Sequence, residues 1–191
     1  MKQFILILGG ARSGKSSYAV QLAKKFGEPV AFIATAASLD REMKRRIKLH
    51  KASRPKKWKL VEEGKDVGLA LTKLPGKYKV VLIDCLGLLI SNLLITNLKD
   101  GQIEKKIKSL IDVILKANRV VILVSNEVGA GIVPENALAR RFRDLLGLAN
   151  QMIAKKADQV ILMQAGIPMK IKSLPTGRQG EQDAKITRDN K

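Results

Sequence analysis

The sequence is poor in cysteine, histidine and aromatic residues. Of its 191 residues, one is cysteine (Cys85), one is histidine (His50) and 4% are Phe, Trp or Tyr. A single cysteine excludes an intrachain disulfide framework and indicates a reducing compartment. The scarcity of aromatic residues predicts a core of Leu, Ile, Val and Ala. It also argues against the aromatic stacking by which single-stranded nucleic acids are bound.

Long apolar runs are lacking as well. No run approaches the ~20 apolar residues that a transmembrane helix needs. The apolar stretch 4–8 is too short for the core of a signal peptide and leads directly into a glycine loop. The sequence therefore predicts a cytoplasmic protein without a membrane span. With 46% hydrophobic residues, the chain is long enough for one well-buried α/β domain.

Acidic residues are few relative to basic ones, 17 against 36, which gives a net charge of +19. Such an excess is typical of nucleic-acid binding, but here the basic residues are spread along the chain. A basic surface also attracts small polyphosphates. We therefore expect a small-molecule phosphate substrate and no nucleic acid, and a nucleic-acid-binding ATPase remains the alternative.

Short apolar runs alternate with helical patterns along the chain. Buried parallel strands are predicted at residues 3–8, 30–35, 79–84, 120–126 and 159–164. Helices are predicted at 15–26, 39–52, 103–117 and 134–157, with Pro134 in the first turn of the last one. A last edge strand is expected at 169–172. The alternation predicts an α/β fold with a single doubly wound, mostly parallel sheet.

The chain divides into two unequal parts. Residues 1–172 hold all the predicted strands and helices and form the expected catalytic domain. The tail 173–191 is polar, is interrupted by Gly and Pro, and has almost no apolar residues. Because such a composition cannot bury a core, the tail is predicted to be disordered.

The segment between the first predicted strand and helix has the pattern of a phosphate-binding loop. It fits G-x-x-x-x-G-K-[ST] with Gly9, Gly10, Ala11, Arg12, Ser13, Gly14, Lys15 and Ser16. The glycines let backbone N–H groups point inward, and the helix N-terminus adds partial positive charge. Lys15 is expected to reach the β- and γ-phosphates, and the Ser16 hydroxyl to ligate Mg²⁺. The expected architecture is that of RecA-like P-loop NTPases, whereas the alternative is a glycine turn with a chance Lys-Ser pair.

Asp84 ends the predicted strand 79–84. Ligands of open α/β sheets bind at the carboxyl ends of strands, so Asp84 is expected to orient Mg²⁺ directly or through water. The predicted metal ligands are therefore Ser16 and Asp84. The alternative is an aspartate that caps the next segment.

His50 lies on the apolar stripe of the helix predicted at 39–52. This spacing alone favours a packed core histidine. However, Arg46 and Arg54 lie four residues to either side, near the same helical face, and nearby positive charge keeps an imidazole neutral. A neutral imidazole beside guanidinium groups is suited to attack on a nucleoside triphosphate, or to general-base catalysis.

Six blocks, taken in order, resemble one enzyme family. They are the phosphate loop, Ile33-Ala-Thr-Ala36, Arg46-Ile-x-x-His50-x-x-x-Arg54-Pro55-x-x-Trp58, Leu82-Ile-Asp-Cys-Leu86, Ser91-Asn-Leu-Leu94 and Ser125-Asn-Glu-Val-Gly-x-Gly-Ile-Val-Pro-Glu-Asn136. Over residues 2–172 the chain is similar to the bifunctional adenosylcobinamide kinase/adenosylcobinamide-phosphate guanylyltransferases of cobalamin biosynthesis. The His50 block and the last block are the most specific.

The resemblance implies two reactions. ATP or GTP phosphorylates the aminopropanol hydroxyl of adenosylcobinamide. GTP then loses pyrophosphate to form a guanylylated histidine, and its GMP passes to adenosylcobinamide phosphate to give adenosylcobinamide-GDP. The family's histidine falls on His50, so the catalytic residues expected here are His50 and Lys15. A kinase with a structural His50 remains an alternative.

The resemblance also implies further nucleotide contacts and an assembly. Beyond the phosphate loop, the family's nucleotide-binding residues fall on Ala34, Thr35, Ala36, Lys51, Ala52, Ser53, Arg54, Glu62 and Asp84. A carboxylate at Glu62 would accept hydrogen bonds from the guanine N1–H and 2-amino groups, although the adjacent Glu63 leaves this register open. The family is homotrimeric, with a histidine helix that swings relative to the phosphate loop.

One segment departs from the resemblance. Members often carry Thr and then a large aromatic residue after Asp-Cys-Leu, whereas this chain has Gly87-Leu88-Leu89. We expect altered affinity rather than lost activity. Glu127 is predicted equally as a metal or substrate contact and as part of a glycine-rich turn. For Arg140, Arg141 and Arg143 a solvated basic face is favoured over contacts with phosphate or another subunit.

Overall fold

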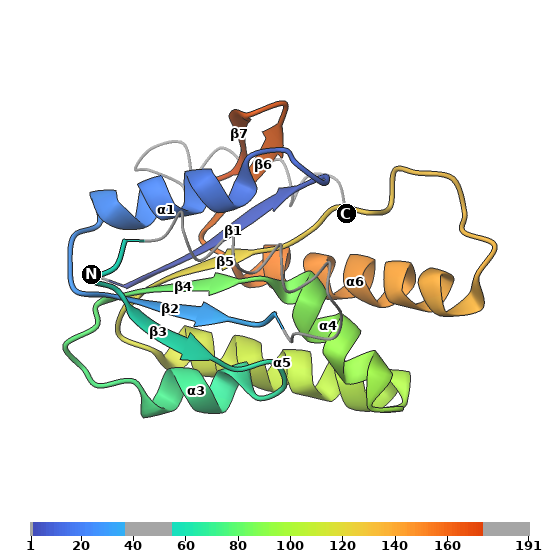
Figure 1. The fold of residues 1–191 in the computed structure, drawn as a ribbon, viewed down its shortest axis with the longest axis horizontal. Helices are drawn as coiled ribbons and strands as arrows, with labels where there is room; N and C mark the ends of the chain where they lie inside the picture. Colours follow the sequence, from blue (N-terminus) through green and yellow to red (C-terminus); the bar gives the residue numbers. More distant parts are fainter. Residues whose placement is uncertain (1, 37–54, 174–191) are drawn as a thin grey trace, which may run out of the picture.

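The computed structural model describes residues 2–36 and 55–173 (Figure 1). The strands are β1 (Gln3–Gly9), β2 (Val30–Ala34), β3 (Lys59–Glu62), β4 (Val80–Asp84), β5 (Val120–Val124), β6 (Gln159–Gln164) and β7 (Ile167–Lys172). The helices are α1 (Lys15–Lys25), α3 (Val67–Lys73), α4 (Leu86–Ile95), α5 (Asp100–Lys116) and α6 (Ala137–Lys156).

The strands form one sheet in the order β3-β2-β4-β5-β1-β6-β7. All neighbours pair in parallel except β6 and β7, which are antiparallel. The carboxyl ends of the parallel strands therefore lie at one edge of the sheet, on the right in Figure 1. This edge carries the start of the phosphate loop after β1, and Asp84 at the end of β4.

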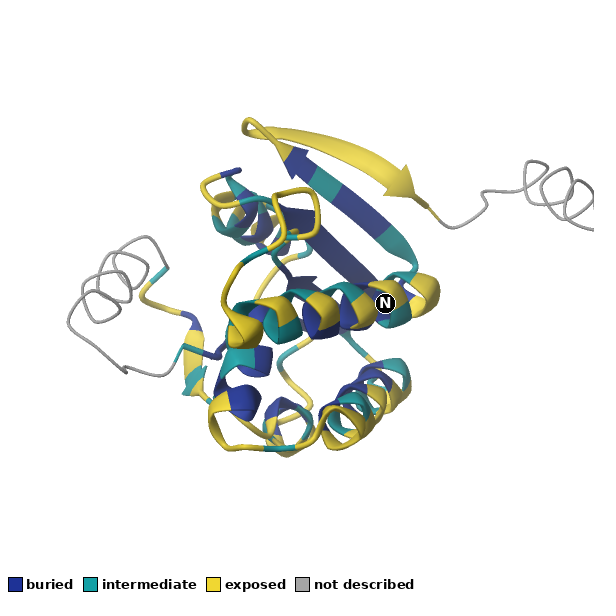
Figure 2. Cartoon of the chain, turned by 90° about the vertical axis from the view of Figure 1, so that its right-hand side faces the viewer, coloured by how far each residue is buried: buried dark blue, intermediate teal, exposed yellow. Residues whose placement is uncertain are grey.

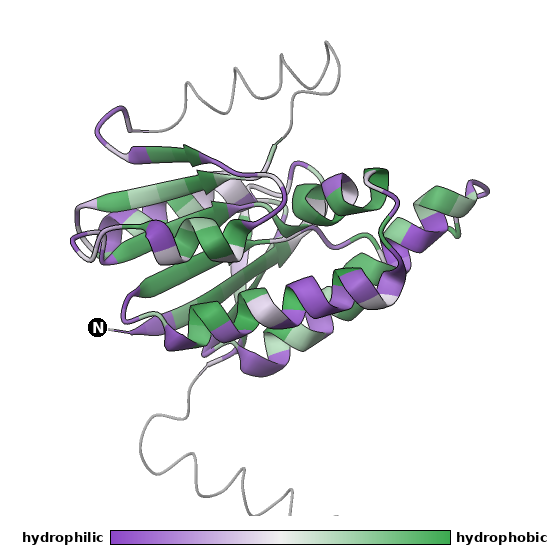
Figure 3. Cartoon of the chain, turned by 90° about the horizontal axis from the view of Figure 1, so that it is seen from below, coloured by the Kyte–Doolittle hydropathy of each residue, from purple (hydrophilic) through white to green (hydrophobic). Residues whose placement is uncertain are grey.

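Both faces of the sheet are covered by helices, which creates two apolar layers. In β1, Leu6 packs in the layer shared with α3, α4, α5 and α6, whereas Ile7 packs in the layer shared with α1. Figure 2 shows the central strands as buried, and Figure 3 shows the strands as mostly hydrophobic beside helices striped with polar residues. Since each buried Ile or Leu contributes ~1.5–3 kcal/mol, these strands anchor the edge that carries the site. The predicted doubly wound α/β fold is confirmed.

The sequence predicts the central strands well and three other elements not at all. β3 is missed because it is a short edge strand whose Lys59, Leu60 and Glu62 are exposed, so it has no continuous apolar run. α3 has only seven residues. α4 buries seven of its ten residues, so it lacks the polar face that reveals a helical period. The helix predicted at 39–52 lies outside the described residues, as does the predicted tail apart from Ser173.

The start of α6 differs from the prediction. We expect Pro134 in its first turn, but the helix begins at Ala137, and Asn136 is its N-cap. The Asn136 Oδ1 accepts a hydrogen bond from the Ala139 N–H at 3.0 Å. Asparagine is favoured at this position because it satisfies an otherwise free N–H, so the chain stays extended through Pro134. Within the described ranges, no helix is long and apolar enough to span a bilayer.

We expect Asn136→Ala to lower the free energy of unfolding by about 1 kcal/mol, because the Ala139 N–H loses its acceptor. Urea denaturation measures this change. Asn118→Ala is the matched control: Asn118 is exposed and lies outside the helices and strands, so its substitution should change stability by less than about 0.5 kcal/mol. Equal losses in the two variants would contradict the capping role.

Candidate functional site

The phosphate loop has a backbone that requires glycine at its first position. Gly9 has φ +154°, and a Cβ there would lie 2.5 Å from the Met163 carbonyl oxygen and 2.6 Å from the Ser13 Oγ. Gly14, which precedes α1, has φ +90°. The Gly166 N–H, in the turn between β6 and β7, donates to the Ser13 carbonyl at 3.1 Å. The loop is therefore held against β6, and the strand–loop–helix context predicted from the sequence is confirmed.

The side chain of Lys15 lies inside this loop. Its Nζ donates to the Gly10 carbonyl at 2.5 Å and lies 3.5 Å from the Ser13 Oγ. Burial lowers the pKa of the Lys15 ammonium, while Cys85 and Asp84 act in the opposite direction. Lys15 is therefore a buried cation with its charge close to the end of β4, where it can meet a polyphosphate.

Thr35 joins the ends of β2 and β4. Its Oγ1 donates to the Cys85 carbonyl at 2.7 Å and accepts from the Cys85 N–H at 2.6 Å, and its own N–H donates to the Asp84 carbonyl at 3.1 Å. The Asn92 Nδ2 donates to the Thr35 carbonyl at 2.8 Å and to the Gly64 carbonyl at 3.0 Å. Thr35 is completely buried, and its hydrogen bonds fix the ends of β2 and β4 relative to each other.

Cys85 is a buried thiol beside Asp84. Burial raises its pKa to about 12, and the Asp84 carboxylate acts in the same direction. The thiol is therefore protonated at neutral pH, and it donates to the Asn126 Oδ1 at 3.6 Å. Such a cysteine is not a nucleophile at neutral pH.

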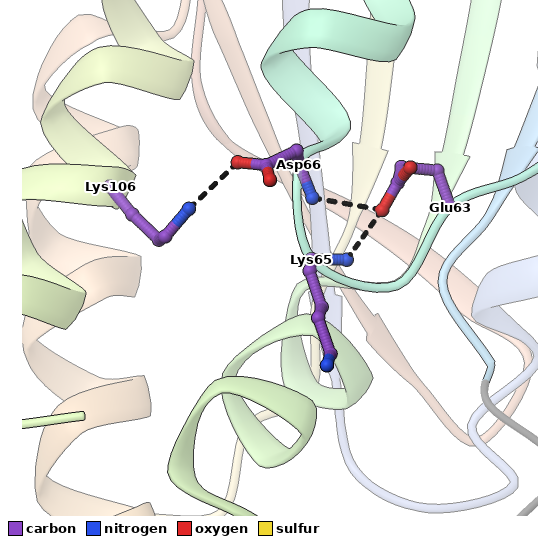
Figure 4. Close-up of polar contacts among 4 residues, drawn as sticks. All are labelled: Glu63, Lys65, Asp66 and Lys106. Carbon is purple, nitrogen blue, oxygen red and sulfur yellow. Dashed lines mark hydrogen bonds and ion pairs between the residues drawn. The ribbon is translucent and has the colours of Figure 1, made fainter. Parts of the chain in front are cut away.

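Two adjacent glutamates lie at the end of β3, Glu62 as its last residue and Glu63 directly after it. Figure 4 shows the contacts of Glu63. The Glu63 carboxylate accepts hydrogen bonds from the Lys65 N–H at 2.8 Å and the Asp66 N–H at 2.9 Å. Glu63 therefore stabilises the turn that leads into α3. Glu62 pairs with Ala34 in the register of β3 and β2 and is exposed. This placement puts Glu62 beside the segment 34–36 at the carboxyl edge.

The remaining predicted residues divide into those outside and those inside the described part of the chain. The predicted residues His50, Lys51, Ala52, Ser53 and Arg54 lie outside the described residues. The described chain stops at Ala36, just beyond β2, and resumes at Pro55, shortly before β3. Ala11 and Arg12 are exposed on the phosphate loop, Ser16 is half-buried in the first turn of α1, and Ala36 is half-buried.

An apolar cavity of about 340 Å³ lies between α3, α4 and α5. Val67, Leu89 and Leu110 are among its lining residues, and the Lys106–Asp66 ion pair of 2.7 Å lies at its rim. None of the phosphate-loop residues lines it. Lys15 and Asp84 do not line this cavity either and lie apart from it, at the carboxyl edge of the sheet.

The family model described as cobinamide kinase / cobinamide phosphate guanyltransferase matches residues 5–171. The chain belongs to this family. It is 40% identical over 170 residues to the bifunctional adenosylcobalamin biosynthesis protein CobP of Pseudomonas aeruginosa, covering 89% of this chain and 98% of that protein. It is 39% identical over 180 residues to the bifunctional adenosylcobalamin biosynthesis protein CobU of Escherichia coli, covering 88% and 99%.

A solved structure from Pyrococcus horikoshii, described as project PH0250, has the same fold. It aligns with a TM-score of 0.56 and 11% identity, covering 91% of this chain and 87% of that one. At this identity the likeness concerns the fold alone. The enzyme family rests on the sequence matches, which include the phosphate loop and the segment around Asp84.

The departure at Gly87 has a structural reason in this member of the cobinamide kinase family. Gly87 lies in the first turn of α4, and a Cβ there would be 3.1 Å from the Asn126 Oδ1. At this distance the threonine that the resemblance leads us to expect would need the Asn126 side chain to shift by a few tenths of an ångström. Glycine instead lets α4 and the segment after β5 approach closely.

The arginines at the start of α6 bond nearby groups of the chain. Arg141 Nε pairs with the Asp100 carboxylate at 2.6 Å, Arg140 donates to the Glu135 carbonyl at 2.6 Å, and Arg143 donates to the Gly129 carbonyl at 3.0 Å. The long loop before α6 has carbonyl groups that need donors, and these guanidinium groups supply them. The solvated basic face stays a prediction, since Arg140 is exposed and Arg141 and Arg143 are half-buried.

Glu127 and Asn92 complete the comparison with the sequence. The Glu127 Oε1 accepts a hydrogen bond from the Gly129 N–H at 2.6 Å, as the glycine-rich-turn alternative expects. Sequence reasoning assigns no role to Asn92, Ser125 or Asn150, all of which are buried. The available signal is the polar residue itself: Asn92 stands in an almost entirely apolar helix, where burial demands a partner.

We expect Gly9→Ala to destabilise the fold by at least about 1–3 kcal/mol, the cost of a side chain in a sparsely populated backbone conformation, because its Cβ also overlaps Met163 and Ser13. Gly10→Ala is the matched control, since no atom lies within 4 Å of its Cβ position. Urea denaturation and nucleotide binding should both separate the two variants. Equal stability of the two would contradict the close approach at Gly9.

Proposed function

We propose that this chain catalyses both reactions of its family. It phosphorylates adenosylcobinamide with ATP or GTP and then transfers GMP from GTP to adenosylcobinamide phosphate, giving adenosylcobinamide-GDP and pyrophosphate. The observation that carries the proposal is a family match over residues 5–171 on a chain whose glycine loop joins a central strand to a helix. The relatives from P. aeruginosa and E. coli are both named as bifunctional in adenosylcobalamin biosynthesis.

The phosphate loop binds the nucleotide in both reactions. Backbone N–H groups from Gly9 to Ser16 surround the phosphates at the N-terminus of α1. Lys15, which is held inside the loop by the Gly10 carbonyl, neutralises charge on the β- and γ-phosphates. In the kinase step the substrate hydroxyl oxygen attacks the γ-phosphorus, the bond to the β–γ bridging oxygen breaks, and the hydroxyl proton is lost.

Ser16 and Asp84 have the donors that suit Mg²⁺. Both supply hard oxygen atoms, a hydroxyl and a carboxylate, and they come from the two segments that border the crevice. Among the described residues, no group of three or more His, Cys, Asp or Glu side chains could hold a metal ion, so phosphate oxygens and water would complete the coordination. Mg²⁺ bound there neutralises charge on the phosphates.

His50 is the proposed nucleophile of the guanylyl step. It is the only histidine of the chain, and the residues 51–54 that follow it are proposed to contact the nucleotide. An imidazole nitrogen attacks the α-phosphorus of GTP, and the bond to the leaving pyrophosphate breaks. A phosphate oxygen of adenosylcobinamide phosphate then attacks the same phosphorus and releases His50.

Glu62 is proposed to select guanine. The resemblance to the family supports Glu62 as the base-reading carboxylate, and Glu62 is the last residue of β3 at the carboxyl edge of the sheet. Ala34, Thr35 and Ala36 run alongside it at the end of β2 and are proposed to border the nucleotide. Their contribution is backbone and van der Waals contact, since the Thr35 hydroxyl bonds Cys85.

We further propose a cytoplasmic homotrimer that acts on small molecules and binds no nucleic acid. The family supports the assembly, and the absence of a clustered basic block supports the choice of partner. Residues 1–172 form the catalytic domain in this proposal, and the tail 173–191 lies outside it.

We expect α-labelled GTP and Mg²⁺ to leave an acid-labile, base-stable label on the protein, because a phosphorus–nitrogen bond forms at His50. His50→Asn should abolish this label yet leave phosphorylation of adenosylcobinamide intact. γ-Labelled GTP, which should leave no label on the protein, is the control. A wild-type protein that takes no label from α-labelled GTP would contradict the guanylyl step and leave the kinase alone.

We expect Glu62→Gln to reduce the preference for GTP over ATP in this labelling reaction by ~10-fold or more, because a charged acceptor of the guanine N–H groups is lost. Glu63→Gln is its matched control: it should lower the free energy of unfolding and keep the preference. The preference is measured by competition between the two nucleotides. If Glu63→Gln lost the preference for GTP while Glu62→Gln kept it, the result would contradict the role of Glu62 and assign the base contact to Glu63.

A further inference from the structure

Strand β5 places Asn126 between Asp84 and the phosphate loop. β5 lies between β4 and β1, and Val124 is in register with both Asp84 and Ile7. The chain beyond β5 continues along β1, because the Ser125 N–H donates to the Ile7 carbonyl at 2.8 Å and the Glu127 N–H to the Gly9 carbonyl at 2.9 Å. Asn126 therefore lies between Asp84 on one side and the phosphate loop on the other.

A buried polar pair, Ser125 after β5 and Asn150 on α6, holds the backbone of Asn126. The Ser125 Oγ donates to the Asn150 Oδ1 at 2.6 Å, and the Asn150 Nδ2 donates to the Asn126 carbonyl at 2.9 Å. Ser125 is completely buried and Asn150 is 6% exposed. Burying such groups in an apolar layer adds little stability over an apolar pair. The contribution specific to this pair is the position of Asn126.

The side chain of Asn126 is fixed from the opposite side. The Cys85 thiol donates to its Oδ1 at 3.6 Å, and Gly87 leaves the room that this amide oxygen needs. With its oxygen turned toward Cys85, the amide presents its two N–H donors elsewhere. Asn126 is half-buried, so part of it is accessible at the carboxyl edge of the sheet.

We propose that the Asn126 amide donates a hydrogen bond to the γ-phosphate of the bound nucleoside triphosphate, and that Asn150, Ser125 and Cys85 act as positioning residues. This inference rests on the proposed function. Lys15 and the N-terminus of α1 attract all three phosphates of the nucleotide. A neutral donor beyond them, beside Asp84, distinguishes a triphosphate from a diphosphate without adding charge.

The test compares two ligands in the presence of Mg²⁺: the β,γ-imido analogue of GTP, and GDP. Asn126→Ala should weaken binding of the triphosphate analogue by ~10-fold and leave GDP binding unchanged, since only the γ-phosphate loses a donor. Asn126→Asp keeps the shape but places a carboxylate beside the phosphate, so the triphosphate should weaken further, by ~100-fold. Asn126→Asp also serves if the alanine variant does not fold.

The positioning residues are tested by the same ratio of GDP to triphosphate affinity. Asn150→Asp keeps the acceptor for Ser125 but removes the donor to the Asn126 carbonyl, so the ratio should move toward that of Asn126→Ala. Asn136→Ala, on the same helix but at its N-cap, is the control: it should lower stability and leave the ratio unchanged. This ratio separates positioning from a purely structural role.

Each outcome decides one claim. A wild-type ratio in both Asn126 variants would overturn the γ-phosphate contact. A wild-type ratio in Asn150→Asp, with a changed ratio in Asn126→Ala, would overturn the positioning role alone. A wild-type protein that binds neither nucleotide would instead refute the proposed function. If the Asn126 variants bound the triphosphate analogue and GDP more weakly to the same extent, Asn126 would have a general structural role. This result would also refute the γ-phosphate contact.

Discussion

The backbone of Gly9 lies so close to β6 and to Ser13 that no side chain fits at this position. This contact fixes where the central strand ends and where the chain turns away from the sheet. Lys15 folds into the loop that results, and α1 starts with its N-terminus at the same edge. Because β5 and β6 flank β1, the strand that leads into the phosphate loop is paired on both sides. The site therefore inherits the rigidity of the apolar core.

A second set of constraints lies at the carboxyl edge, where buried polar side chains connect strand ends that an apolar core alone would leave loose. Thr35 ties β2 to the start of α4, and Asn92 ties Thr35 to Gly64. Asn150 does the same for the end of β5. Each of these groups is costly to bury unless it is fully satisfied. Their hydrogen bonds therefore serve to position the backbone at the carboxyl edge of the sheet.

The sequence predicts those parts of the molecule whose physics is local. A run such as β5, Val120–Val124, is apolar throughout because both its faces are covered, and the glycine loop is a contiguous pattern. The edge strand β3 and the buried helix α4 have no such local signature. Asn150 is invisible in the sequence for a different reason: its role depends on Ser125, which is distant along the chain and meets it only in the folded sheet.

The candidate site shows the same division. The phosphate loop and Asp84 are contiguous with strands that the pattern reveals, so their convergence follows from parallel pairing. The choice between Glu62 and Glu63 does not follow, because the two residues are adjacent at the end of one short edge strand and carry the same functional group. Sequence alone assigns residue types to chemistry, and it does not decide between two neighbouring residues of similar chemistry.

The excess of basic residues also has a structural meaning. Arg140, Arg141 and Arg143 direct their guanidinium groups at carbonyl oxygens of the long loop before α6 and at the carboxylate of Asp100, the first residue of α5. Part of the net charge of +19 is thus used inside the molecule. Exposed ion pairs such as Arg141–Asp100 add little stability, about 0–1 kcal/mol. The charge that remains on the surface can still steer polyphosphates toward the crevice. The positive surface attracts both triphosphates and diphosphates, and the two attractions differ only in strength. Discrimination between them must therefore come from a donor placed at the γ-phosphate, which is the role that the position of Asn126 suits.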